Sequence, residues 1–431
     1  MPPVDRGRRA PEGASRAEDP AITAKPSRAR RTVTLTLVLG CLAGTLVVGA
    51  IHKAQCIGGD WSDGRQYHLA CYTDIVPLFG TEQLVGGRLP YLNPCAPVEG
   101  NCDEYPVLTM YLMRVAGWIS GDEAAPFFWV NAALLTACAG ATAIGIYLLD
   151  ARRALWFALA PSLALEAFVN WDLLAVALAT GGTVAFFRLR DARSGVLLGL
   201  GAAAKLFPAL FAVPFAADRL HRRHPDRAIL LVWTAAASWA VVNLPFMVFG
   251  FHGWWTFFGV NGTRLADWDS LWSIGCRAFT GDAACLPVWV INLLSFVLFV
   301  AIVAVLWASK ARRYDFPRWE LAFPVLVVFL LVGKVYSPQF GLWLLPWFAL
   351  VVGDLRRFVA FEIADVAVFF TRFEFFGDYT GIGGLPRWVF ETAVVIRAAV
   401  LVWCLIGWVR DPARRVPADA EPAAAVAVAR A

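Results

Sequence analysis

The stretch TVTLTLVLGCLAGTLVVGAI, residues 32–51, carries no charged side chain and is bordered by basic residues. A helix needs about 20 consecutive apolar residues to cross the hydrocarbon core of a bilayer. A signal peptide would have a short charged region and an apolar stretch ending at a small-residue cleavage site. The Pro-, Ala- and Arg-rich arm at 1–31 is too long for that arrangement. We therefore predict an uncleaved first transmembrane helix behind a disordered cytoplasmic arm.

The overall composition also indicates a membrane protein. Of the 431 residues, 59% are hydrophobic, 14% are aromatic and 16% are charged. Ordinary soluble domains contain about 25% charged residues. So few charges cannot cover so much apolar surface in water. The same composition excludes disordered, coiled-coil, collagen-like and nucleic-acid-binding proteins.

Further apolar segments follow the first one, with short breaks between them. We predict membrane spans at 32–51, 126–149, 154–169, 171–187, 228–250, 287–308, 319–334, 341–353, 358–375 and 389–409. The apolar segment 195–217 has arginine clusters on both sides, so a single crossing would violate the positive-inside rule. Pro208 and Pro214 can break a helix, so we predict a hairpin of two short helices there. The expected fold is an all-α membrane bundle of about 10–12 transmembrane helices.

The breaks between the spans differ in charge. Basic breaks lie at 152–153, 188–193, 219–227, 310–318, 356–357 and 410–415. By the positive-inside rule these breaks and both termini face the cytoplasm. The other side holds a first outer loop at 52–125, in which the short segment 106–119 is expected to lie in the outer leaflet, and a second outer loop at 251–286. The membrane domain then covers 32–409, and 410–431 form a disordered tail.

Six cysteines fall in the two predicted outer loops: Cys56, Cys71, Cys95, Cys102, Cys276 and Cys285. An even number of cysteines in an oxidising compartment indicates disulfides. Cys95–Cys102 and Cys276–Cys285 are the candidate local pairs, although spacing alone does not fix the connectivity. A zinc site is the alternative, but no CxxC motif or nearby histidine pair occurs. We expect neither a metal nor another cofactor.

Polar side chains near lipid are costly and often functional. In the first outer loop, Asp74 follows Cys71-Tyr72-Thr73, and a carboxylate there can act as a general base toward a hydroxyl. Capping of the following helix is the alternative role. Glu104 and Tyr105 lie in a segment that is either a binding site or a solvated turn.

The turn at 166–172 places Glu166, Asn170 and Asp172 at the outer ends of two predicted helices. Both carboxylates could bind sugar hydroxyls, although Asp172 is equally well placed to cap the second helix.

Two of the five lysines, Lys205 and Lys334, lie within or beside apolar segments. An ammonium group near the outer leaflet boundary would suit a lipid phosphate, and snorkelling to the interface is the alternative. Arg264 in the second outer loop is a further candidate for phosphate recognition. The tryptophans around it could stack on a sugar or only anchor the protein at the interface. No nucleotide-binding motif accompanies these residues.

Several short motifs, taken in order, resemble a known family. Residues 72–75, 104–106 and 170–172 (YTDI, EYP and NWD) are similar to GT-C membrane glycosyltransferases. Residues 205–208 (KLFP) and 336–340 (YSPQF), with WLLPW at 343–347, resemble glycosyltransferase family 87, which includes actinobacterial phosphatidylinositol-mannoside mannosyltransferases. The likeness spans roughly 70–350, and the excess of arginine over lysine fits an actinobacterial source.

The resemblance implies metal-independent, inverting transfer of a sugar, often mannose, from a polyprenyl-phosphate donor. The acceptor would be a lipid or a cell-envelope glycan outside the cytoplasmic membrane. Asp74 would be the general base. The implied substrate-binding residues are Lys205, Lys334 and Arg264 for the donor phosphate, Glu104 and Asp172 for sugar hydroxyls, and Tyr105, Tyr336 and Gln339 in the shared motifs. A transporter or lipid flippase is the alternative, but we find no internal repeat of the kind that many transporters show.

Overall fold

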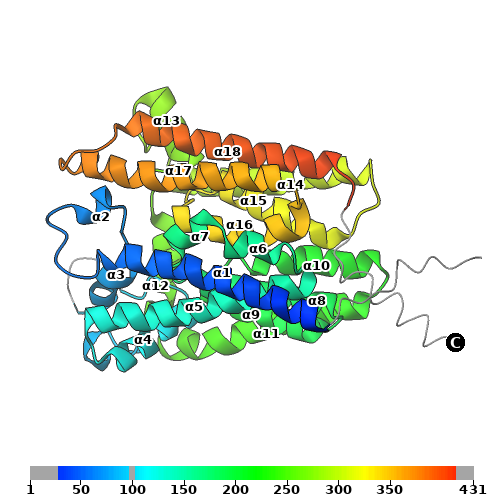
Figure 1. Ribbon diagram of the computed structural model, residues 1–431, viewed down its shortest axis with the longest axis horizontal. Helices are drawn as coiled ribbons and strands as arrows, with labels where there is room; N and C mark the ends of the chain where they lie inside the picture. The colour runs from blue at the N-terminus through cyan, green and yellow to red at the C-terminus, as the bar shows by residue number, and fades with distance from the viewer. Residues whose placement is uncertain (1–27, 97–101, 414–431) are drawn as a thin grey trace, which may run out of the picture.

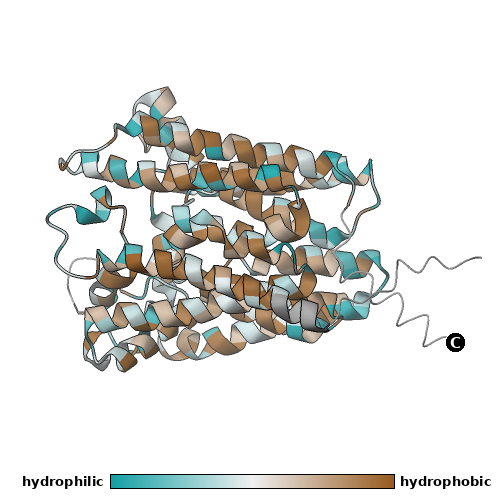
Figure 2. Ribbon diagram, in the orientation of Figure 1, coloured by the Kyte–Doolittle hydropathy of each residue, from teal (hydrophilic) through white to brown (hydrophobic). Residues whose placement is uncertain are grey.

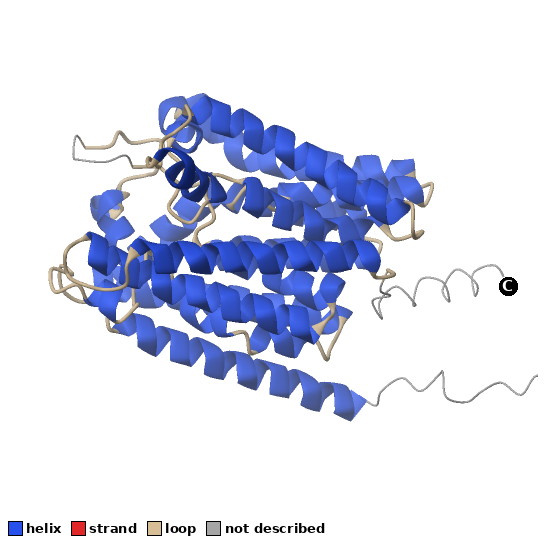
Figure 3. Cartoon of the chain, turned by 90° about the horizontal axis from the view of Figure 1, so that it is seen from above, coloured by secondary structure: helices blue, strands red, loops and turns tan. Residues whose placement is uncertain are grey.

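The computed structural model describes residues 28–96 and 102–413. The described residues form helices, turns and loops, with no strand among them (Figure 3). This confirms the predicted all-α fold class. The predicted arm, apart from its last residues, and the tail beyond residue 413 lie outside the described residues. The first helix begins at Arg28, within the predicted arm.

Five helices are long and apolar enough to cross a membrane, so the chain is a multi-pass membrane protein. They are α1 (Arg28–Ala54), α5 (Ala124–Leu149), α11 (Pro225–Phe249), α14 (Val288–Ala311) and α18 (Arg387–Arg410). Each coincides with a predicted span. A sixth long helix, α17 (Leu355–Tyr379), is less apolar because it carries several charged side chains.

The remaining predicted spans and the predicted hairpin are made of shorter or broken helices. They consist of α6 (Ala154–Ala158) with α7 (Pro161–Glu166), α8 (Asp172–Phe187), α9 (Asp191–Ala204), α10 (Ala209–His221), the 3₁₀ turn η2 (Arg318–Leu321) with α15 (Ala322–Val332), and α16 (Gly341–Trp347) with the π-turn η4 (Phe348–Val352). The predicted hairpin is present as α9 and α10. Pro208 immediately precedes α10, whereas Pro214 lies inside that helix and does not end it.

The first outer loop holds α2 (Arg65–His68), α3 (Ile75–Thr81), the 3₁₀ turn η1 (Val85–Gly87) and α4 (Val107–Ser120). The second holds α12 (Phe251–Thr263) and α13 (Leu271–Thr280), and a further 3₁₀ turn, η3 (Pro338–Phe340), precedes α16. At 1.5 Å per residue, α4 is about 21 Å long, which is too short to cross a bilayer. The two outer loops are therefore largely helical, but α4 does not add a membrane crossing.

The long helices lie roughly side by side along the long axis of the molecule (Figure 1). Figure 2 shows hydrophilic residues gathered toward the two ends of the bundle and hydrophobic residues along the helices between them. In Figure 1, α2, α3 and α13 lie at the left end, whereas α1 begins and α18 finishes at the right end. The outer-loop segments therefore gather at the end opposite the start of α1.

Candidate functional site

A cavity of about 860 Å³ lies among the outer-loop segments and the adjoining helix ends. Its wall combines residues that are far apart in the sequence, including parts of α12 and α17 and the loop before η3. Seven of the predicted site residues line it: Asp74, Glu104, Tyr105, Lys205, Arg264, Lys334 and Gln339. The fold thus brings most of the predicted site into one space.

Asp74 immediately precedes α3, but its carboxylate makes no capping hydrogen bond to that helix. Thr73 takes this part instead, because its Oγ1 accepts a hydrogen bond from the N–H of Ile75 at 3.2 Å. The same hydroxyl donates to the carbonyl oxygen of Phe168 at 2.7 Å. The Asp74 carboxylate is therefore available to the cavity.

Two side chains hold the Asp74 carboxylate. The hydroxyl of Tyr72 donates to Oδ1 at 2.7 Å, and Nδ2 of Asn170 donates to Oδ2 at 2.7 Å. Desolvation raises the pKa of Asp74 above its ordinary value, while the bonds from Asn170 and Tyr72 and the ammonium group of Lys205 act in the opposite direction. A carboxylate with a raised pKa is a stronger base once it is ionised.

Lys205 lies at the break between α9 and α10, in an extended backbone conformation. Its Nζ is 2.9 Å from Oδ1 of Asp172, which is fully buried. The same Oδ1 accepts a 2.7 Å hydrogen bond from Nε1 of Trp343. The ammonium group also lies 5.0 Å from the centre of the Phe340 ring. Asp172 therefore fixes the position of a cation at the cavity wall.

Two further basic side chains, Lys334 and Arg264, lie where the cavity wall meets α12. Nζ of Lys334 donates to the carbonyl oxygen of Gly262 at 3.2 Å, and Arg264 lies 3.6 Å from Asp267. Both side chains line the cavity wall at this point. Two neighbouring cations of this kind repel each other, so an anion bound between them would be stabilised by both.

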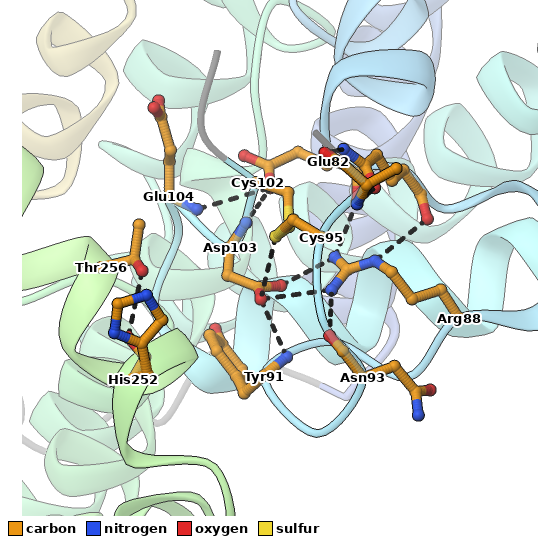
Figure 4. Close-up of a disulfide and its surroundings, with 12 residues drawn as sticks. Glu82, Arg88, Tyr91, Asn93, Cys95, Cys102, Asp103, Glu104, His252 and Thr256 are labelled. Carbon is orange, nitrogen blue, oxygen red and sulfur yellow. Dashed lines mark hydrogen bonds and ion pairs between the residues drawn. A yellow bond between two sulfur atoms is a disulfide. The ribbon is translucent and has the colours of Figure 1, made fainter. Parts of the chain in front are cut away.

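Glu104 is presented by a cross-linked loop next to the cavity (Figure 4). Cys95 and Cys102 form a disulfide, and the adjacent Asp103 carboxylate lies 2.8 Å from Nη2 of Arg88. The N–H of Asp103 donates to Oε2 of Glu82 at 2.6 Å. Figure 4 shows the Glu104 carboxylate directed away from this disulfide. The loop thus supports a carboxylate that faces the cavity.

The structure also contains disulfides between Cys56 and Cys71 and between Cys276 and Cys285. Cys95–Cys102 and Cys276–Cys285 are the two candidate local pairs of the sequence analysis, and Cys56 and Cys71 are the two loop cysteines that those pairs left over. Cys95, Cys102 and Asp103 group ligand-type atoms closely enough to hold a metal ion. However, both sulfurs are joined to each other, and the Asp103 carboxylate is bound to Arg88.

Two predicted site residues do not line the cavity. Asp172 is buried beneath Lys205, and Tyr336 is buried with its ring 3.7 Å from the guanidinium carbon of Arg397. Glu166 is also fully buried and is not part of the wall. The structure therefore does not place either Asp172 or Glu166 where it could contact a sugar directly.

The cavity-lining residues that were absent from the predicted site include three polar side chains: Tyr72, Asn170 and Arg372. The first two lie within the motifs, but their hydrogen bonds to Asp74 depend on the fold. Arg372 lies in the predicted span 358–375, and a charge inside an apolar span is itself a signal of function. Its Nη1 is 2.6 Å from Oδ2 of Asp269.

Comparison with solved structures finds proteins of low sequence identity to this chain. ArnT from Cupriavidus metallidurans bound to undecaprenyl phosphate is 13% identical with a TM-score of 0.45, over 89% of this chain and 76% of ArnT. The Archaeoglobus fulgidus oligosaccharyltransferase in the apo form is 12% identical with a TM-score of 0.38, over 86% of this chain and 55% of that protein. No curated protein matches the chain.

A family model described as glycosyltransferase family 87 matches residues 104–338. This range contains the Glu104-Tyr105 segment, the turn at 170–172 and both lysines of the cavity wall. The match confirms the resemblance drawn from the short motifs. Because it covers more than half of the 431 residues, the chain is a glycosyltransferase that belongs to glycosyltransferase family 87.

Proposed function

We propose that this glycosyltransferase moves a sugar, with mannose as the first candidate, from a polyprenyl-phosphate donor to a hydroxyl of a lipid or cell-envelope glycan. Asp74 is the general base. The observation that carries the proposal is the arrangement of one cavity, in which a carboxylate free of any capping role shares the wall with Lys205, Lys334 and Arg264.

The proposed reaction is a single displacement. The acceptor oxygen attacks the anomeric carbon as its proton passes to Asp74, and the bond between that carbon and the phosphate oxygen breaks. The polyprenyl phosphate leaves with the bonding electron pair, and the cations stabilise its charge. Attack from the side opposite the leaving group inverts the anomeric configuration. In this account, Glu104 and Gln339 bind sugar hydroxyls, while Asp172 acts by holding Lys205.

A lipid-borne donor suits the surroundings of the cavity. Phe257 and Phe258 of α12, Asn292 of α14 and Phe329 of α15 belong to its wall. The helix α14 is apolar, and only 6% of its most apolar 18-residue segment is buried inside the protein. A surface of this kind faces hydrocarbon in a bilayer, so a long isoprenoid chain could remain in the membrane beside α14 while its phosphate reaches Lys334.

The extracytoplasmic face is the proposed location of the site, with both termini in the cytoplasm. The three disulfides belong to outer-loop segments at the same end of the bundle as the cavity, and disulfides persist in oxidising compartments. The arginine-rich breaks, such as that at 219–227, connect the opposite helix ends. This distribution follows the positive-inside rule.

The test is a transfer assay in membranes that contain the expressed chain. Radiolabelled polyprenyl-phosphate mannose is supplied in one reaction, and labelled nucleotide-linked mannose in a matched one. We expect lipid- or glycan-bound label from the polyprenyl donor alone. A panel of other polyprenyl-phosphate sugars determines the sugar, and an absence of transfer from every member would contradict the proposal.

A further inference from the structure

Both oxygens of the Asp74 carboxylate are occupied by separate donors, which fixes the plane of the group. Tyr72 donates to Oδ1 and Asn170 to Oδ2, each at 2.7 Å. These donors approach from different parts of the chain, one from the segment before α3 and one from the turn before α8. A carboxylate oxygen can accept more than one hydrogen bond, so each retains capacity for a substrate proton.

The orientation of the Asn170 amide follows from its other contacts. Its Oδ1 accepts a 2.7 Å hydrogen bond from the N–H of Trp171, so Nδ2 is the atom that faces Asp74. Nδ2 also donates to the hydroxyl oxygen of Tyr105 at 2.7 Å. Because the Tyr105 oxygen accepts this bond, its own proton remains available to the cavity. The amide is therefore a donor to both groups.

The two segments that carry these donors are tied together by their backbones. The N–H of Asp74 donates to the carbonyl oxygen of Val169 at 2.8 Å. The fully buried Lys53, at the end of α1, donates from Nζ to the carbonyl oxygen of Tyr72 at 2.8 Å. These contacts hold together the two segments that carry the carboxylate and its donors.

We propose that Tyr72 and Asn170 are positioning residues that keep the Asp74 carboxylate ionised and directed at the acceptor hydroxyl. This inference rests on the proposed function of Asp74 as the base. Hydrogen bonds to the charged form of a carboxyl group favour ionisation. Without these donors, desolvation would leave a larger fraction of Asp74 protonated and unable to accept the proton of the acceptor.

Other charged groups also face this carboxylate. They are the amino groups of Lys205 at the end of α9 and of Lys53 in α1, and the carboxyl group of Asp172 in α8. Tyr105 faces it from the segment before α4, and Arg372 of α17 faces Tyr72. The variants below leave all of these groups in place, so a change in titration reports the deleted hydrogen bond.

The decisive variant is Tyr72→Phe, because it removes only the hydroxyl. The Tyr72 ring stacks on Phe373 with a centroid distance of 5.4 Å, and phenylalanine can keep this contact. A hydrogen bond to a charged group contributes about 1.5–3 kcal/mol, which corresponds to a pKa change of about one unit or more. We expect the acid limb of the kcat/KM profile to move up by about one pH unit, with near-normal kcat at high pH and little change in KM.

Matched variants separate this role from general damage. Tyr111→Phe removes a hydroxyl that donates to the carbonyl oxygen of Pro90 and should leave the acid limb in place. Asn170→Ala should move the limb in the same direction as Tyr72→Phe. Infrared difference spectra against Asp74→Asn give the carboxylate titration without an acceptor substrate, and the band should show the same shift.

The outcomes distinguish a failure of the proposed base, Asp74, from a failure of the proposed positioning role of Tyr72 and Asn170. If Asp74→Asn retains full transfer, the proposed base is contradicted. If Asp74→Asn is inactive but Tyr72→Phe keeps the wild-type acid limb and carboxylate titration, the positioning inference alone is overturned. An equal loss of Tyr72→Phe activity at every pH, without a shift in the carboxylate band, would likewise indicate a purely structural role and overturn it.

Discussion

Nδ2 of Asn170 lies 2.7 Å from Oδ2 of Asp74, although 96 positions separate the two residues in the sequence. This contact joins the segment before α3 to the turn before α8 and fixes one side of the cavity. It also explains how the short motifs at 72–75 and 170–172 contribute residues to the same site. The carboxylate, its donors and the nearby cations form one unit that can be tested residue by residue.

The first prediction concerns the Lys205–Asp172 pair. Lys205→Met should destabilise the protein by about 3–5 kcal/mol, because it leaves a buried carboxylate without its cation. Adding Asp172→Asn should recover much of this loss, since the amide oxygen can still accept from Trp343. Thermal unfolding in detergent measures both effects. If the double variant is no more stable than Lys205→Met, the pairing argument is contradicted.

Transfer should respond differently from stability in these two variants. Both lack the ammonium group at the cavity wall, so we expect both to remain poorly active even where the double variant melts normally. Full transfer by the stable double variant would exclude a role for Lys205 with the donor.

The second prediction concerns donor binding by Arg264 and Lys334. Arg264→Gln and Lys334→Gln should each raise the KM for the polyprenyl-phosphate donor by about tenfold, because each removes a charge-assisted contact to phosphate. Arg387→Gln, at an exposed position outside the cavity, is the matched control. Donor titrations at fixed acceptor concentration check the result, and an unchanged KM in both cavity variants would refute phosphate binding by this pair.

The third prediction concerns pH and the buried Glu82. Burial, followed by the neighbouring Glu104 and Asp103 carboxylates, raises its pKa to about 8 despite a hydrogen bond from the N–H of Asp103. The folded state therefore holds a proton that the unfolded state has released. This contribution to stability is complete below about pH 4.5 and is lost as the pH rises through about 8.

Glu82→Gln should remove this dependence, because the amide oxygen keeps the hydrogen bond and does not titrate. Apparent melting temperatures between pH 5 and pH 9 provide the measurement. We expect the wild type to lose more stability than Glu82→Gln over this range, on the order of a few kcal/mol. Parallel curves would show that Glu82 is not the group responsible.

The long helices were predictable because their length and apolar composition meet the thickness of a bilayer. The broken segments were harder. The interruption at Lys205 was expected from flanking charge, but the break between α6 and α7 was not, and it turned one predicted span into two short helices. The local signal for this break is Pro161, which begins α7 and leaves Ala160 in an extended conformation, and its effect inside so apolar a segment was not predicted.

The residues of the candidate site were predictable where a charged side chain lies close to lipid, because burying such a side chain there costs free energy. Asp74, Lys205 and Lys334 were found on this basis, and all three line the cavity. Tyr72 and Asn170 are ordinary residues whose part depends on a contact between distant segments. Asp172 shows the opposite case, because its residue type indicated a substrate contact, yet the fold buries it under Lys205.

The most direct test of the central claim is the rate of sugar transfer by Asp74→Asn in membranes with matched expression. Asp63→Asn is the control, because Asp63 lies in the same outer loop and is half exposed. General-base catalysis contributes about 10²–10⁴-fold to a rate, so we predict at least a hundredfold loss for Asp74→Asn and near-normal transfer for the control. Transfer by Asp74→Asn at the wild-type rate would contradict the assignment of Asp74 as the catalytic base.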